Sequence, residues 1–302
     1  MGKKIGMVGI GMMGHGIATN LLKHGHELVV LDHPGNQPLD DLVVRGLRVV
    51  GTAREVATAS DVVILVLTGS PQVETVLTAS GGVLEGLRPG SVVIDCSTAI
   101  PSSTLRMAQA VQSVGGRFLD APMTRTPREA AQGRLNLLVG GDVTVFAACR
   151  PLLACFAENI DHVGPVGAGH SMKLLHNFVS LGMVTLLAEA AACAQANAVP
   201  MASFADVLAK GGGGGVALER IRPFLLDSDP SGLRFSIANA RKDLDYYHSM
   251  AADAGVSRQV AAATLSTLES ALKVAAPETW VPQLASILRG GPLAPQADPT
   301  AS

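Results

Sequence analysis

The sequence predicts an α/β protein in which a mainly parallel sheet domain is followed by an all-helical domain. In the first half of the 302-residue chain, short β-branched runs alternate with helical patterns. Apolar strands that alternate with helices are typical of a parallel sheet covered on both faces. After about residue 164 these runs stop, and long Ala- and Leu-rich helical patterns follow. The chain is long enough to bury a core in each domain.

The first domain, which we place at residues 1–163, contains the patterns of eight strands. We expect strands over 4–8, 27–31, 48–50, 62–67, 91–95, 117–120, 135–139 and 160–163. Helical patterns lie between most of them, for example over 70–78, 102–113 and 143–156. A ligand of such a sheet binds at the carboxyl ends of its strands, where the strand order reverses.

The second domain, at 164–290, begins with a long interdomain helix over 169–197, and Pro200 follows its end. Further helices are expected over 202–209, 216–225, 237–254 and 257–274, with a five-glycine loop at 211–215. The remaining residues of the domain are too few to cover such a long apolar helix, so we expect a homodimer or homotetramer. Residues 291–302, rich in Pro and Ala, are expected to be a disordered tail.

The composition excludes several classes of partner. The chain is 48% hydrophobic and 16% charged, which is typical of a globular protein. A net charge of −2 and only 3% aromatic residues argue against a nucleic acid or an acidic membrane as partner. The longest apolar stretch, 178–199, contains Glu189, Gln195 and Asn197, so we expect a buried helix there and no membrane span.

The cysteines indicate a reducing compartment. The four are Cys96, Cys149, Cys155 and Cys193, and no two of them form a C-x-x-C pair. Each lies in an apolar run, so we expect reduced, buried thiols that behave as small hydrophobic groups. With no signal peptide before the first strand, we expect a cytoplasmic protein.

A glycine motif follows the first strand. Gly9-x-Gly11-x-x-Gly14 stands between an apolar run and a helical pattern, and a second apolar run ends at Asp32. This context is typical of a Rossmann-type dinucleotide site, in which backbone N–H groups at a helix N-terminus face a pyrophosphate. The carboxylate of Asp32 can bind the ribose hydroxyls and repels a 2′-phosphate, so we expect NAD in preference to NADP. A glycine-rich turn without a ligand is the alternative.

Two more stretches at strand ends carry polar groups. Hydroxyl groups in Asp95-Cys96-Ser97-Thr98 could donate to a carboxylate or carboxamide, or could simply cap the following helix. The loop Thr124-Arg125-Thr126 offers a guanidinium, whose planar fork suits an oxyanion. A surface arginine is the alternative for Arg125.

The long helix begins with Gly167-x-Gly169-x-x-x-Lys173-x-x-His176-Asn177. Lys173 and Asn177 are four residues apart, so they share one face of the helix. We expect the glycines to let this end of the helix approach a ligand. A lysine on the inner face of an apolar helix gives up its proton more readily, which suits a general acid. A solvent-facing lysine is the alternative.

These stretches, together with Lys242-Asp243-Leu244, resemble the β-hydroxyacid dehydrogenase family over about residues 3–290. That family includes 3-hydroxyisobutyrate dehydrogenase, tartronate semialdehyde reductase and sulfolactaldehyde reductase. The resemblance implies that Lys173 is the catalytic acid/base, that Asn177 orients the substrate and that Lys242 reaches the cofactor. The substrate residues that we expect are Ser97, Thr98, Thr124, Arg125, Thr126 and His176. The cofactor residues that we expect are Gly9, Ile10, Gly11, Met12, Met13, Gly14, Asp32, Leu67, Thr98 and Lys242, with no metal.

The sequence departs from the family pattern at two places. The substrate loop of the family usually reads Ser-Gly-Gly, whereas here it is Thr124-Arg125-Thr126, similar to the Gly-Arg-Thr of sulfolactaldehyde reductases. His176 stands where many members have Asn. Both departures concern the substrate and leave the reaction class unchanged.

The resemblance implies an NAD-dependent oxidoreductase that interconverts a short 3-hydroxy acid, similar to 3-hydroxyisobutyrate, and its semialdehyde. A more polar anionic aldehyde, such as sulfolactaldehyde or tartronate semialdehyde, is the first alternative. Two further alternatives are a reductase of imines and a nucleotide-binding protein without catalysis. Arg125 argues against the imine, because a cation needs an anion, and Lys173 and Asn177 argue against the loss of catalysis.

Overall fold

The computed structural model describes residues 3–290, so the tail expected at 291–302 lies outside the described residues. Residue contacts divide the chain into two compact units, of which the first ends at Lys173 and the second begins at Leu174. The division falls inside helix α9 (Ala168–Ala196), ten residues after the boundary that the sequence suggested. Each unit is described by itself below.

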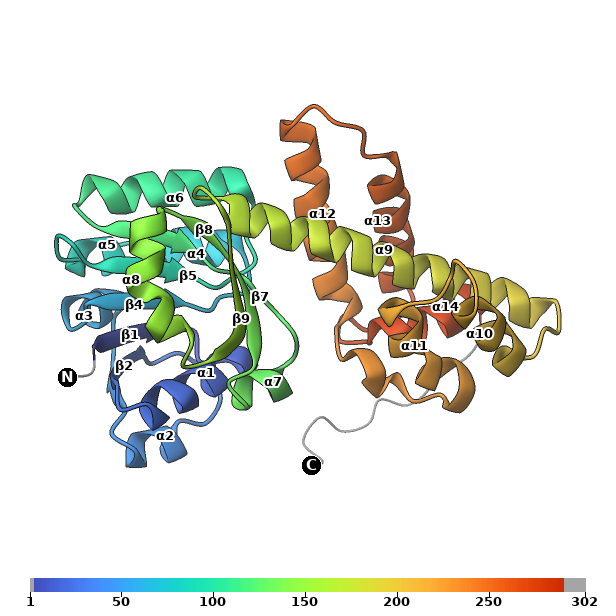
Figure 1. Cartoon of the computed structure of the whole chain (residues 1–302), viewed down its shortest axis with the longest axis horizontal. Coiled ribbons are helices and arrows are strands. Elements are labelled where there is room, and N and C mark those ends of the chain that lie inside the picture. Colours follow the sequence, from blue (N-terminus) through green and yellow to red (C-terminus); the bar gives the residue numbers. More distant parts are fainter. Residues whose placement is uncertain (1–2, 291–302) are drawn as a thin grey trace. The chain divides into compact units, whose positions relative to one another are not determined.

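The first unit is built on one nine-stranded sheet (Figure 1). Its strands are β1 (Lys4–Val8), β2 (Glu27–Leu31), β3 (Arg48–Val50), β4 (Val62–Leu65), β5 (Val92–Asp95), β6 (Arg117–Asp120), β7 (Met123–Thr124), β8 (Leu135–Gly141) and β9 (Ala157–Gly164). The order is β3-β2-β1-β4-β5-β6-β8-β7, with β9 on β8, and the first six strands pair in parallel. Only β8 with β6 and β7 with β8 pair antiparallel. The mainly parallel Rossmann-type sheet is therefore confirmed, and its order reverses between β1 and β4.

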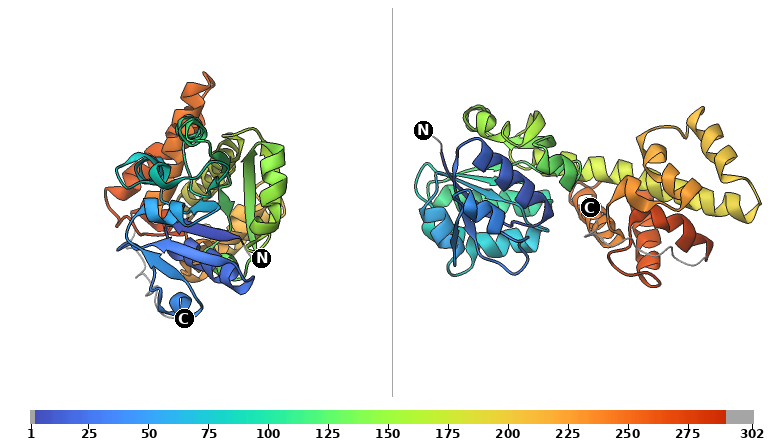
Figure 2. Two further views of the ribbon diagram at one scale, coloured as in Figure 1. Left: turned by 90° about the vertical axis from the view of Figure 1, so that its left-hand side faces the viewer. Right: turned by 90° about the horizontal axis from the view of Figure 1, so that it is seen from below.

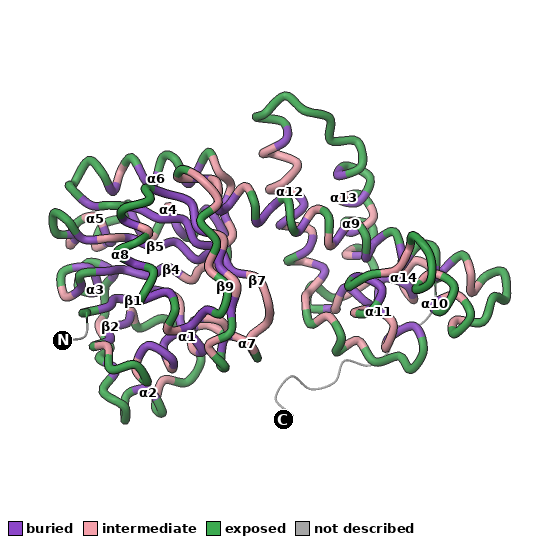
Figure 3. Tube along the Cα trace, in the orientation of Figure 1, coloured by how far each residue is buried: buried purple, intermediate pink, exposed green. Residues whose placement is uncertain are grey.

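Helices cover both faces of this sheet (Figure 2). They are α1 (Met12–Lys23), α2 (Asp40–Val44), α3 (Ala53–Thr58), α4 (Ser70–Thr78), α5 (Val83–Gly86), α6 (Pro101–Ser113), α7 (Pro127–Ala131) and α8 (Val143–Leu153). Side chains of α1, α2, α7 and α8 pack with Met7 and Ile64 in one apolar cluster, whereas those of α3 to α6 pack with Val63 and Leu65 in another. Neighbouring strand residues thus point to opposite faces. The centres of β1, β2, β4, β5 and β6 are buried, whereas β3 and β9 are largely exposed (Figure 3).

The second unit is helical. It contains the later part of α9, then α10 (Met201–Ala209), α11 (Val216–Asp227), α12 (Ile237–Asp253), α13 (Gln259–Leu272) and α14 (Leu284–Arg289), with two short 3-10 turns at Pro230–Leu233 and Val281–Gln283. Leu181, Val184 and Ala188 of α9 pack with Ile221 of α11 and Leu244 of α12 in one core. Among the described residues of this unit there is no strand, only one isolated bridge between residues 236 and 280.

The elements that the sequence did not predict are short. They are α2, α3, α5, α7 and α14, with four to six residues each, and the two-residue strand β7. An element of one turn cannot display a helical period, which explains why the pattern missed them. Strand β4 ends at Leu65 and not at 67, because the amide of Leu67 turns away to bond with the hydroxyl of Ser97.

Within residues 3–290, α9 is the one helix that is long and apolar enough to cross a membrane by length and composition, and 44% of its most apolar window is buried in the structure.

The expectation of four buried cysteines is wrong for Cys193 on α9, which is exposed, and for Cys155, which is half-buried. Cys96 and Cys149 are buried, and all four thiols are free.

Candidate active site

The glycine motif forms an open cradle at the carboxyl end of β1. Gly9 has a φ of +95°, and a Cβ there would lie 2.2 Å from the carbonyl oxygen of Val66. A Cβ on Gly14 would lie 2.1 Å from the carbonyl oxygen of Gly9, so both positions must be glycine for the strand and helix to pack. Gly11, just before α1, has no other described atom within 4 Å of such a Cβ. A ligand can therefore reach the first turn of α1 at Gly11, where a pyrophosphate would bind.

The segment after β2 fixes this cradle from the side. The Asn36 side-chain oxygen accepts a hydrogen bond from the amide of Ile10 at 3.1 Å, and the amide of Gln37 donates to the carbonyl of Ile10 at 2.7 Å. The amide of Ile10 thus stabilises the fold, and the expected contact of Ile10 with the cofactor stays a prediction. Asp32 directly follows β2 and is exposed, as a group that meets a ribose must be. The sequence analysis did not identify Asn36. The only feature of the sequence that could have indicated its role is the position of an amide side chain soon after the strand end.

A hollow of about 420 Å³ lies beside the cradle within the first unit. It is lined by Met12, His15, Gln37, Pro38, Asp41 and Pro127. His15 and Asp41 face each other across 3.1 Å between an imidazole nitrogen and a carboxylate oxygen. The hollow and the open Gly11 thus lie side by side at the first turn of α1, where a dinucleotide of this fold binds its phosphates.

Ser97 and Thr98 follow the end of β5, but they differ in environment. Ser97 is buried, and its hydroxyl oxygen accepts a hydrogen bond from the amide of Leu67 at 2.9 Å. This hydrogen bond ties the loop after β4 to the end of β5, and the expected contact of Ser97 with substrate stays a prediction. Thr98 is half-buried at the same strand end, and its contact with substrate or nicotinamide stays a prediction.

The loop after β7 holds Arg125 in a backbone conformation that favours glycine. Its φ is +80°, one of three positive values outside glycine among residues 3–290. The guanidinium Nη1 donates to the carbonyl oxygen of Arg134 and forms an ion pair with Glu158 on β9. The hydrogen bond from Arg125 lowers the pKa of Glu158. The structure thus places the guanidinium against protein groups, and its contact with a substrate anion stays a prediction.

The two threonines of this loop are engaged with the protein. Thr126 caps α7, and its hydroxyl donates to Glu129, whose pKa this hydrogen bond lowers. Thr126 therefore stabilises the helix start, and its expected contact with substrate stays a prediction. The hydroxyl of Thr124 accepts a hydrogen bond from the amide of Asn136 at 3.1 Å.

The first turn of α9 is fastened to the sheet by Asp120, the last residue of β6. The carboxylate accepts hydrogen bonds from the amides of Gly167 and His170, each at 2.8 Å. A Cβ on Gly169 would lie 2.3 Å from the carbonyl oxygen of Leu138. Gly169 therefore lets the helix approach β6 and β8, and the expected approach of this helix end to a ligand stays a prediction.

Lys173 lies one turn after His170 and is buried, with 9% of its surface exposed. A buried lysine is uncommon and calls for a specific role. Helix α9 keeps Lys173 and Asn177 one turn apart on the same face, as the spacing predicted.

In the second unit, Asn177 is oriented from two sides. Its amide nitrogen donates to a carboxylate oxygen of Asp243 at 2.6 Å, and its amide oxygen lies 3.0 Å from Nδ1 of His176. A carboxylate only accepts hydrogen bonds, so the amide nitrogen must face Asp243 and the oxygen must face the imidazole N–H. Lys242 Nζ lies 3.2 Å from the other oxygen of the buried Asp243. The sequence pointed to Lys242 and missed the orienting role of its neighbour.

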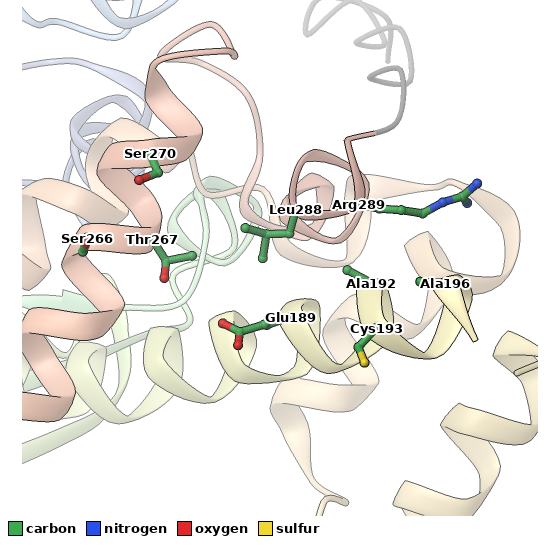
Figure 4. Close-up of a pocket in the computed structure, with 9 residues that line it drawn as sticks. All are labelled: Glu189, Ala192, Cys193, Ala196, Ser266, Thr267, Ser270, Leu288 and Arg289. Carbon is green, nitrogen blue, oxygen red and sulfur yellow. The ribbon is translucent and has the colours of Figure 1, made fainter. Parts of the chain in front are cut away.

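A second hollow, of about 530 Å³, lies elsewhere in the second unit (Figure 4). It is lined by Glu189, Ala192, Cys193, Ala196, Ser266, Thr267, Ser270, Leu288 and Arg289, from α9, α13 and α14. None of the residues expected in the site lines it. Within residues 3–290 no group of three metal-binding side chains is close enough to hold a metal ion, and the expectation of a metal-free site stays a prediction.

Comparison with known proteins agrees with both units. Residues 4–164 match the family model of the NAD binding domain of 6-phosphogluconate dehydrogenase, and residues 167–279 match that of the NAD-binding of NADP-dependent 3-hydroxyisobutyrate dehydrogenase. The chain is 33% identical to the NAD-dependent L-serine dehydrogenase of Pseudomonas aeruginosa over 88% of this chain and 87% of that protein. It is 35% identical to the 2-hydroxy-3-oxopropionate reductase of Escherichia coli over 62% of this chain and 63% of that protein.

A solved structure leads to the same family. Mycobacterium tuberculosis 3-hydroxyisobutyrate dehydrogenase with L-serine superimposes with a TM-score of 0.86 at 26% identity, covering 96% of this chain and 100% of that chain. An imine reductase from Myxococcus stipitatus shares 19% identity at a TM-score of 0.64, which is a likeness of fold alone. The chain belongs to the β-hydroxyacid dehydrogenase family of NAD(P)-dependent oxidoreductases.

Proposed function

We propose that the protein is an NAD-preferring dehydrogenase that interconverts a short 3-hydroxy acid, similar to 3-hydroxyisobutyrate, and its semialdehyde in the cytoplasm. The observation that carries the proposal is the buried Lys173, one helical turn from Asn177, whose amide is fixed by Asp243. A buried amine and an oriented amide are the groups needed to move a proton and hold an oxygen beside a hydride acceptor.

The chain's own residues would bind, orient and supply the proton. A nicotinamide dinucleotide, when bound, supplies or accepts the hydride. The open cradle at Gly11 and the first turn of α1 would hold its pyrophosphate, and Asp32 would accept hydrogen bonds from the ribose hydroxyls. Lys173 would donate its proton to the carbonyl oxygen of the semialdehyde as negative charge develops there. In the oxidation the same amine would take the proton back from the hydroxyl.

Asn177 would keep the substrate oxygen in line with Lys173. Its amide is held by Asp243 and His176, so little rotational freedom is lost when a substrate binds. His176 would therefore act on the substrate through Asn177. The Asn that many family members have at position 176 could orient Asn177 in the same way, through its own side-chain amide.

The size and charge of the substrate depend on Arg125. Side chains at Thr124, Arg125 and Thr126 leave less room than glycines would, and the guanidinium adds a positive charge. A small and strongly polar acid is thus the second candidate substrate, with a sulfonate or tartronate semialdehyde as examples. The ion pair with Glu158 means that a substrate anion would share or replace a partner that the guanidinium already has.

Assembly through α9 is part of the proposal. Leu175, Val179 and Leu186 on this helix are exposed in the second unit, and Met183 lies among them. Contiguous exposed apolar side chains at helical spacing are typical of a surface that another subunit covers. A homodimer or homotetramer would bury them.

One experiment tests the reaction, the substrate and the cofactor together. Methylmalonate semialdehyde, tartronate semialdehyde, a three-carbon sulfonate aldehyde and a cyclic imine would be reduced with NADH and with NADPH, for the wild type and for Lys173→Ala. We expect a semialdehyde with NADH to give the highest kcat/KM, and Lys173→Ala to lower kcat by about two to four orders of magnitude. A preference for NADPH would contradict the role of Asp32. A Lys173→Ala variant with more than about a tenth of the wild-type kcat would remove this lysine from the mechanism.

A further inference from the structure

The first unit contains a buried group of ionisable side chains that the proposed reaction does not use. Asp95 at the end of β5, Asp120 at the end of β6 and His170 in the first turns of α9 are all fully buried. Each imidazole nitrogen of His170 lies 3.9 Å from an oxygen of one of these carboxylates. Burial raises the pKa of Asp95, whose second carboxylate oxygen has no hydrogen-bond partner within residues 3–290. Such a costly arrangement suggests a role beyond packing.

The ring of His170 connects three elements. Its Nε2 lies 3.1 Å from the carbonyl oxygen of Ser97, and its Nδ1 lies 2.7 Å from the hydroxyl oxygen of Thr104 on α6. A carbonyl oxygen only accepts hydrogen bonds, so Nε2 must carry a proton. His170 therefore ties α9 to the residue that precedes Thr98.

The backbone of the same turn is held independently. Asp120 accepts hydrogen bonds from the amides of Gly167 and His170, and Gly169 lies against β8 without room for a Cβ. These contacts set how far the turn lies from the sheet. The hydrogen bond of the His170 ring then sets the position of the helix relative to the Ser97–Thr98 segment.

Lys173 lies three residues after His170, which is about 4.5 Å along the helix axis. A helix is stiff over one turn, so whatever fixes His170 also fixes the base of the Lys173 side chain. Misplacement of a catalytic group by about 1 Å can cost about 100-fold in rate.

We propose that His170 is a positioning residue, which holds Lys173 at a fixed place relative to Ser97 and Thr98 through the hydrogen bond from Nε2 to the carbonyl of Ser97. The inference rests on the proposed role of Lys173 and adds a residue that acts through it.

A matched pair of variants tests which side of the ring matters. In His170→Gln the amide nitrogen can take the place of Nε2 and still donate to the carbonyl of Ser97. In His170→Asn the shorter amide can take the place of Nδ1 and reaches only Thr104. The single-turnover rate of nicotinamide oxidation should fall by about tenfold or more in His170→Asn, and His170→Gln should keep most of the wild-type rate. Both variants remove the ring, so a purely structural role would lower their melting temperatures without separating their rates.

A double variant shows whether His170 acts through Lys173. In the Lys173→Ala background, His170→Asn should change the remaining rate by less than about twofold, because the positioned group is gone. Equal rates of His170→Asn and His170→Gln, or a full additional loss in the double variant, would overturn the inference. If Lys173→Ala itself kept the wild-type rate, the proposed function would fail instead, so the two failures are distinguishable. Should His170→Asn not fold, Thr104→Val in the His170→Gln protein must leave the rate within about twofold for the inference to stand.

Discussion

Gly169→Ala should destabilise the first unit, although alanine is the better helix former. The added Cβ would lie 2.3 Å from the carbonyl oxygen of Leu138 and 2.8 Å from both the carbonyl and a carboxylate oxygen of Asp120. Two of these three atoms belong to the backbone of central strands, so they cannot rotate away. Either the helix or the strands must shift, and with them the hydrogen bonds that Asp120 accepts from backbone amides at the start of α9.

The size of the effect follows from two opposing contributions. Forcing an extra carbon into a packed site costs about 1–3 kcal/mol, and the contacts with backbone oxygens favour the upper part of that range. Replacing glycine by alanine inside a helix gains about 1 kcal/mol, and less in the first turn. We therefore expect a net loss of about 1–2 kcal/mol. A unit of this size loses about 2–4 °C in Tm per kcal/mol, so Tm should fall by about 2–8 °C.

Gly182→Ala is the matched control, because it makes the same change in the same helix. A Cβ there has only the hydroxyl of Thr264 within reach, at 4.0 Å. The full gain in helix propensity should then be observed, as an increase of about 1 kcal/mol in the free energy of unfolding. Differential scanning calorimetry resolves transitions of both units, and the fluorescence of Trp280 follows the second unit alone. A Gly169→Ala protein that melts at or above the wild-type temperature, or two variants that shift in the same direction, would refute the packing argument.

The remaining predictions concern side chains at the surface and in the core. Cys193 should react rapidly with a thiol reagent in the native protein, whereas Cys96 should react only after unfolding, since burial raises the pKa of its thiol; a Cys193→Ser protein that keeps the rapid phase would contradict this. Arg125→Ala should raise KM for the best anionic substrate by one to two orders of magnitude, because a charged hydrogen bond contributes about 1.5–3 kcal/mol; full kcat/KM in steady-state assays would show that the guanidinium does not bind the substrate. The lowered pKa of Glu158 means that its ion pair adds stability above the ordinary value of 4.5, which is lost as the pH falls through the lowered pKa. Glu158→Gln should therefore make Tm depend less on pH over that range. If the slope of Tm against pH were the same in the variant and the wild type, the ion pair would not contribute in this way.

The sheet and the long helices could be predicted from the sequence because their patterns are long and mostly apolar. Strands β1, β2, β3 and β6 have the predicted ends. The role of Gly9 and Gly14 was also readable, because a strand, a tight turn and a helix in that spacing leave few other conformations. The helical second unit followed from the absence of β-branched runs.

Hydrogen-bond partners across the fold could not be predicted, because they depend on side chains that are distant in sequence. The hydroxyl of Ser97 at a strand end predicts a substrate contact, but nothing near it in the sequence indicates the hydrogen bond that it accepts from the amide of Leu67. Asp120 lies 47 residues before Gly167, whose amide it binds. His170 stands among the residues of a recognised motif, but nothing in the motif indicates that its ring faces the carbonyl of Ser97.

The start of α9 also has a consequence for where the protein can be divided. A fragment that ends at residue 163, where the strand pattern stops, would include Asp120 but neither of the amides that bind it. Each hydrogen bond to a charged group contributes about 1.5–3 kcal/mol, so the fragment would carry a buried carboxylate without its two donors. A fragment of the first unit that folds by itself should therefore extend at least through His170, which makes the first turn of the interdomain helix a structural part of the nucleotide-binding unit.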